Sequence, residues 1–292
     1  TKMRESYELT VGGRLGPGDS DDKEASVLNR IIRWTGNGIE YEADPRQVER
    51  LLEEVGLDGD GVKGVVTPSV KPLQHQVEAE QVLGPSEHTR FRGLAARANY
   101  LAADRVDILF AAKEVCRFMA HPSDLAMAAL KRLCRYLRDR PRVVFKMPFQ
   151  KCSTIDVYSD TDWAGCVRTR KSTSGGCVVL GSHTTKAWSA TQASIALSSG
   201  EAEYYGVVRA TGVGLGIQAL LRDAGVHLPL RVWTDSSAAM GTAGRQGLGK
   251  LRHLDCHTLW LQQRLRRRDF ELRKVLGEKN PADIFTKHLE SA

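Results

Sequence analysis

Four acidic side chains in the second half of the chain stand where a strand ends or a helix begins. Asp160 ends an alternating apolar and polar stretch that predicts a strand, and Asp235 ends a second expected strand. Glu203 and Asp283 stand in the first turns of two expected helices. Carboxylates gathered at one edge of a sheet repel one another unless cations neutralise them. Two Mg²⁺ ions about 4 Å apart would do so and would suit phosphodiester hydrolysis.

Each of the four acids also has an ordinary structural explanation when it is taken alone. Asp235 suits a turn or a cap, Asp283 suits the positive end of a helix, and an isolated Glu203 would be solvated or ion-paired. Glu201 matches a capping box with Ser198, and it cannot share a helix face with Glu203. The order strand, helix, strand, helix is what favours a common site.

The expected elements that carry these acids follow a β-β-β-α-β-α-α-β-α order. A long helix begins near Ser198 and ends near Asp223, and small residues such as Gly206 and Gly214 would let it lie close to a sheet beside Glu203. The expected strands cover 154–160, 174–181, 185–189, 230–235 and 270–276, and further helices cover 251–268 and begin again at 280. Short turns between the first three strands predict an antiparallel meander.

Two further patterns look like metal sites but are incomplete. His253 and His257 lie four residues apart on an expected helix, but neither an HExxH glutamate nor a third ligand accompanies them. Packing or nucleic-acid contact is therefore the stronger interpretation of these histidines. Asp58 and Asp60 begin a Gly-rich stretch that lacks the later ligands of a calcium loop, so it predicts a tight turn.

The first half of the chain reads as a smaller α+β region. Strands are expected over 5–11, 25–34, 39–42 and 143–147, and a helix opened by Asp44-Pro45 ends at Gly56. After a linker over 62–85, three helices are expected over 86–101, 106–119 and 124–137. The third carries a basic run that is either a solvated face or a support for a nucleic-acid backbone: Lys131, Arg132, Arg135, Arg138 and Arg140.

Composition and charge indicate the compartment of the chain and the kind of partner that it would bind. The chain has 292 residues, with 42 Lys plus Arg against 35 Asp plus Glu, and the net charge of +7 weakly favours a polyanionic partner. Six scattered cysteines without a CxxC pair predict reduced thiols in a cytosolic or nuclear compartment. No apolar run approaches the about 20 residues needed to span a bilayer, so we expect no membrane partner. The chain begins in mid-pattern at Thr1, as a fragment would.

Six short segments of the second half, in this order, resemble one known family. They are Tyr158-Ser-Asp-Thr-Asp-Trp-Ala-Gly, Lys171-Ser-Thr-Ser-Gly-Gly-Cys-Val, Ser198-Ser-Gly-Glu-Ala-Glu-Tyr, Trp233-Thr-Asp-Ser-Ser-Ala-Ala, Arg252-His-Leu-Asp and Pro281-Ala-Asp-Ile-Phe-Thr-Lys. Together they are similar to the ribonuclease H domain of copia-type LTR retrotransposon Pol polyproteins, over about residues 150 to 290. Two segments of the first half, 91–108 and 133–137, are more loosely similar to the end of the same family's reverse transcriptase.

The resemblance implies a fold and a domain order. The fold is α/β, with a ribonuclease H-like five-stranded mixed sheet and flanking helices, preceded by a smaller α+β region with a three-helix unit. Residues 1–85 would be a reverse-transcriptase palm or connection remnant, 86–148 a helical thumb-like segment, and 149–292 the ribonuclease H-like domain.

The resemblance also implies the site and its chemistry. Asp160, Glu203, Asp235 and Asp283 would hold two Mg²⁺ or Mn²⁺ ions and would cleave the RNA strand of an RNA/DNA hybrid. The family pattern favours Asp160 over Asp162, its nearest competitor on the same strand face. For contact with the nucleic acid we expect the basic residues Arg245, Lys250, Arg252 and Arg135.

Partners and limits follow from the same resemblance. We expect the RNA/DNA hybrid and the rest of a Pol polyprotein as partners, namely a reverse-transcriptase palm and an integrase, in a cytoplasmic retroelement particle or in the nucleus. The polymerase Tyr-x-Asp-Asp signature is absent from the chain, so DNA synthesis is not expected. The segment before the last helix has no histidine to aid product release, so we expect either modest turnover or a substitute role for His288.

Two alternatives stay open from the sequence. The first is a catalytically decayed module that binds the hybrid without cleaving it. The second is an integrase-like member of the same superfamily that acts on double-stranded DNA, although an inward Glu203 on the first long helix is the ribonuclease H arrangement.

Overall fold

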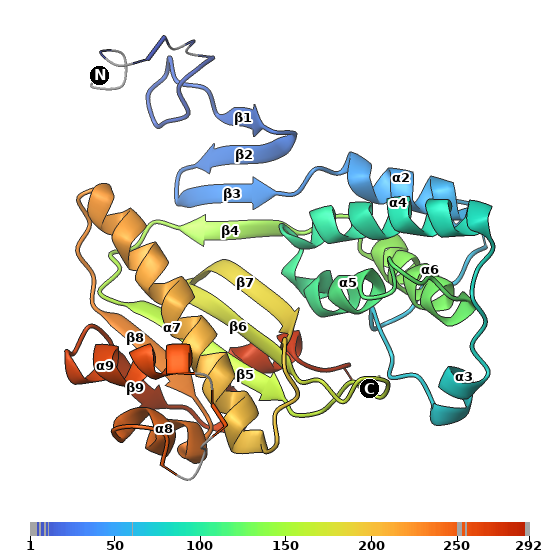
Figure 1. The fold of residues 1–292 in the computed structure, drawn as a ribbon. Coiled ribbons are helices and arrows are strands. Elements are labelled where there is room, and N and C mark those ends of the chain that lie inside the picture. The colour runs from blue at the N-terminus through green and yellow to red at the C-terminus, as the bar shows by residue number, and fades with distance from the viewer. Residues whose placement is uncertain are drawn as a thin grey trace.

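Two separate sheets, each with its own helices, organise the chain (Figure 1). The computed structural model describes residues 5, 7–8, 10, 12–59, 61–249, 253–254 and 256–289. None of the helices in this described part is both long enough and apolar enough to cross a membrane.

The first sheet is antiparallel, in the order β1-β2-β3-β4. Its strands are β1 (Glu24–Val27), β2 (Arg30–Thr35), β3 (Gly38–Glu42) and β4 (Val144–Pro148). The single strand expected over 25–34 is wrong, because Leu28 and Asn29 take positive φ angles of 51° and 64° and turn it into a hairpin. The strand expected over 5–11 is also wrong for the residues described there, which have no strand partner.

Four helices beside this sheet share one core. They are α2 (Arg46–Val55), α4 (Pro85–Ala102), α5 (Leu109–Cys116) and α6 (Asp124–Asp139), with the turn η1 (Val106–Ile108) before α5. Leu51 of α2 packs with Phe91, Leu101 and Leu130 of the later helices, and all four side chains are buried. The short helix α3 (Gln74–Glu78) lies within the expected linker. This core crosses residue 85, where the boundary between the first two domains stays a prediction.

The second sheet has the order β7-β6-β5-β8-β9. Its strands are β5 (Ile155–Asp162), β6 (Thr173–Leu180), β7 (His183–Thr191), β8 (Leu230–Thr234) and β9 (Glu271–Lys274). The pairs β5–β6 and β6–β7 are antiparallel, whereas β8 runs parallel to both β5 and β9. The expected fold class, an α/β protein with a five-stranded mixed sheet and flanking helices, is confirmed.

The long helix α7 (Ser199–Asp223) lies across this sheet and contacts β5, β6 and β8 (Figure 1). Ser198 caps it, since its hydroxyl accepts a hydrogen bond from the Glu201 amide at 3.2 Å, an interaction that typically contributes about 1 kcal/mol. Val207 and Ala210 of the helix are buried against Ile155 and Val157 of β5. The other helical elements are α8 (Ser237–Gly244), η2 (Cys256–Leu259), α9 (Trp260–Arg266), η3 (Gly277–Lys279) and η4 (Pro281–Phe285).

Two expected helices are shorter than their sequence patterns suggest. Of the segment 251–268, residues 253–254 are non-helical, and regular structure begins with the 3₁₀ turn at Cys256. The helix expected from residue 280 is a single 3₁₀ segment, η4. In both places a backbone turn tighter than the α-helix takes over near the helix start.

Polar contacts join the lobe of α2 and α4–α6 to the lobe of the second sheet. Lys113 on α5 donates a hydrogen bond to the Thr173 hydroxyl of β6 at 2.9 Å. Arg117 lies 2.6 Å from the sulfur of Cys166, in the turn that follows β5. Helix α5 also contacts β7 and η4, so the two lobes share an interface close to the end of β5.

Gly206 sets how closely α7 approaches β5. A Cβ at this position would lie 2.6 Å from the Thr161 hydroxyl oxygen and 2.9 Å from that of Ser159, both buried on β5. We expect Gly206→Ala to lower the free energy of unfolding by about 1–3 kcal/mol, the usual cost of overpacking. In urea denaturation the midpoint should therefore fall.

Gly212→Ala is the matched control on the same helix. A Cβ at Gly212 meets nothing within 4 Å, so the variant should gain up to about 1 kcal/mol from the better helix propensity of alanine. Equal midpoints for the two variants would contradict the close approach of helix and strand.

Candidate active site

Three of the four expected acids gather in one place. Asp160, Glu203 and Asp235 each offer a carboxylate oxygen, and these oxygens all lie within 4.8 Å of one another. They come from the end of β5, the first turns of α7 and the residue that follows β8. Because β5 and β8 run parallel, their last residues meet at the same edge of the sheet.

Asp160 is fixed from the side of the sheet opposite α7. Its carboxylate accepts a hydrogen bond from the hydroxyl of Thr286, which is fully buried just after η4. Gly175, the β6 partner of Asp160, makes room for this contact, since a Cβ there would lie 2.6 Å from the Thr286 methyl group. Asn280 holds η4 in place by donating to the Ser159 carbonyl at 2.9 Å.

The electrostatic setting of Asp160 disfavours its charge. Burial raises the pKa of the Asp160 carboxyl above its ordinary value, the Thr286 hydrogen bond opposes the shift, and the charges of Asp283 and Asp235 add to it. The side chain therefore carries its negative charge at a cost that a nearby cation would remove.

The negative charge of Glu203 is disfavoured in the same way, and more strongly. Burial, followed by the charges of Asp160 and Asp235, raises the pKa of Glu203 to about 9. Its Oε2 is buried and has no hydrogen-bond partner among the described residues. An orphaned carboxylate oxygen that faces two other carboxylates is what a ligand of a divalent cation requires.

Asp235 is placed by the turn between β8 and α8. Ser236 caps α8 by accepting a hydrogen bond from the Ala239 amide at 3.1 Å, so the cap role belongs to the serine rather than to Asp235. A Cβ on Gly277 would come within 3.2 Å of the Asp235 carboxylate. The missing side chain at Gly277 leaves that oxygen free to face Asp160.

Asp283 lies beside the group of three and is not a member of it. It is close enough for its charge to raise the pKa of Asp160, but its own carboxylate pairs with the ammonium of Lys287 at 2.5 Å. Its role as a fourth ligand stays a prediction.

The other acids of β5 and α7 lie in different surroundings. Asp156 accepts a hydrogen bond from the Trp233 indole at 2.7 Å, and the Trp233 ring stacks on Tyr158, which supports packing as the role of Tyr158. Asp162 ends β5 outside the group of three. Glu201 is buried and accepts from the Leu197 amide at 2.9 Å, so it braces the start of α7 as its sequence pattern suggested.

His253 has a protein partner. Its Nε2 lies 2.7 Å from the carboxylate of Glu201, so it ties the segment before α9 to the start of α7. The side chain of His257 lies outside the described part of the structure.

The basic residues expected to contact nucleic acid differ in their surroundings. Arg245 donates to the Leu248 carbonyl at 2.6 Å, and Arg135 is exposed on α6. Lys250 and Arg252 lie outside the described residues. Their contacts with nucleic acid remain predictions.

His288 is half-buried between the two lobes. Its Nδ1 is 3.0 Å from the Ser69 hydroxyl, and its ring packs edge-on against Phe110. Burial lowers the pKa of His288 to about 4. The proposal that it aids product release is untested.

Sequence reasoning missed two partners of the acids, namely Thr286, which donates to Asp160, and Lys287, which pairs with Asp283. Thr286 and Lys287 both lie in the Pro281-Ala-Asp-Ile-Phe-Thr-Lys segment, three and four residues after Asp283. Spacings of three and four residues are those of neighbours in an α-helix, but the segment is a 3₁₀ turn that ends at Phe285, so periodicity alone does not identify these contacts.

Comparisons with known proteins find relatives among the Pol polyproteins of plant transposons. The chain is 33% identical over 156 residues to the retrovirus-related Pol polyprotein from transposon RE1 of Arabidopsis thaliana, which is 53% of the chain but 11% of that protein. It is 24% identical over 270 residues to the corresponding polyprotein from transposon TNT 1-94 of Nicotiana tabacum, covering 88% of the chain and 20% of that protein. The chain thus spans only about a tenth to a fifth of these relatives.

A third relative is not named as a Pol polyprotein. The secreted RxLR effector protein 161 of Plasmopara viticola is 34% identical over 113 residues, 38% of the chain and 78% of that protein. No family model matches the chain.

Among solved structures, LC11-RNase H1, isolated from compost, is similar with 18% identity and a TM-score of 0.34, covering 46% of the chain and 93% of that structure. A TM-score this low does not establish a shared fold, so the fold class rests on the strand order described above.

The raised pKa of Glu203 predicts how stability depends on pH. Between about pH 4.5 and 9 the folded chain retains a proton on Glu203 that the unfolded chain has lost, so in EDTA the free energy of unfolding should fall as pH rises. The contribution of this group to the slope is at most about 1.4 kcal/mol per pH unit. Urea midpoints at pH 5, 7 and 9 measure it.

Glu203→Gln is the comparison that isolates this group. The neutral amide cannot titrate, so the decline between pH 5 and 9 should become shallower in the variant. An unchanged slope would mean that Glu203 is not the strained carboxylate described here.

Proposed function

We propose that the chain is a ribonuclease H that hydrolyses the RNA strand of an RNA/DNA hybrid, and its similarity to the retrovirus-related Pol polyproteins of plant transposons supports this proposal. The observation that carries the proposal is the meeting of Asp160, Glu203 and Asp235 within 4.8 Å at one sheet edge. The proposal concerns this chain alone, which is a small part of the length of the polyproteins it matches.

We propose that Asp160, Glu203 and Asp235, with Asp283 beside them, hold two Mg²⁺ or Mn²⁺ ions. Hard carboxylate oxygens are the ligands that these cations prefer, and the buried, unpartnered oxygen of Glu203 fits one. Such ions, when bound, activate the attacking water and stabilise the leaving oxygen of a phosphodiester.

The chain's own residues would prepare this chemistry. Asp160 is oriented by the Thr286 hydroxyl, so one of its oxygens faces the other two carboxylates. Beside Asp160 and Asp235 and without a bound cation, Glu203 carries a proton at neutral pH. It must release this proton for a cation to bind. Asp283 would be the fourth acid at the cation. For this, its carboxylate would have to separate from the ammonium of Lys287.

The substrate and the setting are part of the same proposal. A net charge of +7 suits a polyanionic duplex. We propose that the chain works beside the reverse-transcriptase palm and integrase of a Pol polyprotein, in a cytoplasmic element particle or in the nucleus.

A second candidate function is a module that binds the hybrid without cleaving it. One observation favours it, because the ion pair with Lys287 already neutralises Asp283 without any metal. The same nuclease assay separates the two candidates.

Asp160→Asn tests the proposed chemistry. Removing one charge from the centre of the group should slow RNA cleavage in a labelled RNA/DNA hybrid by about a hundredfold or more, since the cations contribute several kcal/mol to the transition state. The rate is measured at millimolar Mg²⁺ and Mn²⁺.

Asp156→Asn is the matched control on the same strand. Asp156 accepts its hydrogen bond from Trp233 away from the group of three, and asparagine can still accept it. This variant should cleave at the unchanged rate. If Asp160→Asn also cleaves normally, the site assignment is wrong, and hybrid binding without any cleavage by the unaltered chain would favour the second candidate.

A further inference from the structure

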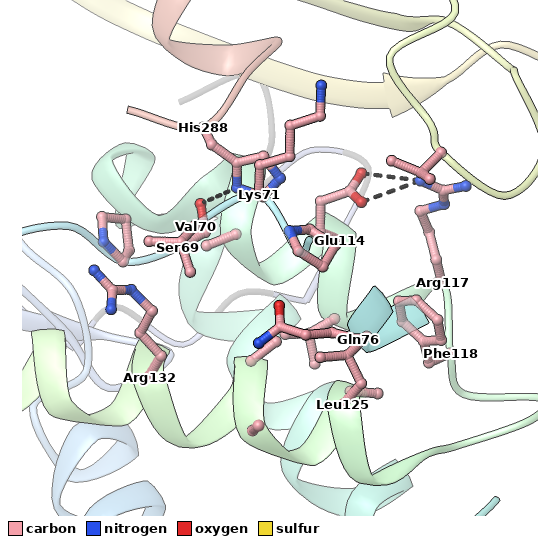
Figure 2. Close-up of a pocket in the computed structure, with 18 of the residues that line it drawn as sticks. Ser69, Val70, Lys71, Gln76, Glu114, Arg117, Phe118, Leu125, Arg132 and His288 are labelled. Atoms are coloured by element: carbon pink, nitrogen blue, oxygen red, sulfur yellow. Dashed lines mark hydrogen bonds and ion pairs between the residues drawn. The ribbon is translucent and has the colours of Figure 1, made fainter. Parts of the chain in front are cut away.

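A cavity of about 410 Å³ lies between the two lobes, outside the carboxylate site. Its walls come from the segment 68–72, from α5 and α6, from the turn 165–168 after β5, and from His288 near the end of the chain (Figure 2). Cavities of this size are typical of sites for small organic ligands.

One side of the cavity is apolar. Phe118 and Leu125 line it near each other, whereas Val70 lines it beside Ser69 (Figure 2). Ala128 and Ala129 of α6 also line it and are exposed, so the surface they leave is open to an incoming molecule. An apolar wall of this kind suits the face of a flat ring system.

The only acid in the described lining is already neutralised. Glu114 pairs with Lys113 at 2.5 Å and with Arg117 at 3.1 Å. Although burial opposes it, these two cations hold the pKa of Glu114 below its ordinary value. Arg168 on the same wall pairs with Glu80.

Four further cations of the lining have no acidic partner. Lys71 stands in the segment 68–72, while Lys131, Arg132 and Arg135 lie on one face of α6 at helical spacing. In the described part of the chain none of the four has a carboxylate within 4.0 Å. The cavity therefore has a rim of cations without direct ion pairs, of which Lys71 interacts at longer range with the Asp162 carboxyl and lowers its pKa against the effect of burial.

Arg132 points to a ligand most directly. One guanidinium nitrogen donates to the Thr67 hydroxyl at 2.9 Å, which fixes the side chain, whereas its Nε is buried and has no partner in the described structure. The guanidinium is therefore fixed in the wall of the cavity, where its charge suits a bound anion.

We propose that this cavity binds a nucleotide, with its phosphate beside Arg132 and its base against Phe118 and Leu125. Several unpaired cations favour a phosphate, which carries more charge than a carboxylate. The apolar wall favours a planar body over a bare ion. Ser69 and Gln76 add polar groups at the edge of the cavity that a base can hydrogen-bond.

The nucleotide could be a free monophosphate or the 5′-phosphorylated end of a strand, since both present the same phosphate and base. Both lobes supply walls of the cavity, so the occupant would also stabilise the contact between them. The site stands apart from the proposed nuclease reaction, and its test needs neither metal nor cleavage.

The test is a calorimetric titration of the whole chain in EDTA with adenosine 5′-monophosphate and, separately, with a short 5′-phosphorylated single strand. Saturable one-to-one binding of either probe supports the proposal, and the tighter probe identifies the source of the nucleotide. Adenosine and inorganic phosphate are titrated alongside and should each bind at least about tenfold more weakly, because each lacks one half of the contact.

Two pairs of variants locate the binding. Arg132→Gln should weaken it about tenfold or more, whereas Lys186→Gln, which removes an exposed cation on β7 away from the cavity, should leave it unchanged. Ala129→Phe should block the cavity sterically without altering charge, and Ala219→Phe on an exposed position of α7 is its control.

Three results would overturn the proposal. The first is no binding of either phosphorylated probe at millimolar concentration, and the second is equal binding of inorganic phosphate, which would mean an anion patch only. The third is binding that Arg132→Gln and Ala129→Phe both leave intact. Because no catalysis is measured, an inactive nuclease would not affect any of these outcomes.

Discussion

The repulsion among three carboxylates held within 4.8 Å is the constraint on which the second lobe depends. Burial, which contributes most, and this repulsion together raise the pKa of Glu203 to about 9, and a chain that gains nothing from such an arrangement would be more stable without it. The surrounding structure must therefore hold the three acids in place against their own electrostatics. Strained charge of this kind is characteristic of functional sites, where a cation or a substrate relieves it.

The acids are held from both faces of the sheet. On one face, Gly206 lets α7 approach β5 closely enough for Glu203 to reach the strand end. On the other face, Gly175 and Asn280 seat η4 so that the Thr286 hydroxyl meets Asp160. The interface with the helical lobe lies just beyond, where α5 contacts the turn after β5. The carboxylate site and the nucleotide cavity thus share a structural neighbourhood while they use different residues.

Much of this could be predicted from the sequence, because local patterns determine it. Alternation placed β5 and β8, the Ser198 cap placed α7, and these elements bring Asp160, Glu203 and Asp235 together as expected. The failures have physical causes. The turn at Leu28 and Asn29 has positive φ angles, but neither residue is a glycine, so the sequence does not indicate the turn. The helical pattern over 251–268 begins late, and the Lys287 partner of Asp283 depends on a 3₁₀ turn that periodicity cannot distinguish from an α-helix.

The central claim is that the three carboxylates form a site for divalent cations. Titration with Mn²⁺, followed by the loss of the free-ion signal in electron paramagnetic resonance, measures this directly on the whole chain. We expect saturable binding that weakens markedly in Glu203→Gln, since that variant removes a ligand and one of the three charges. Mn²⁺ binding of equal affinity in the chain and in Glu203→Gln, or no binding at millimolar Mn²⁺, would contradict the account.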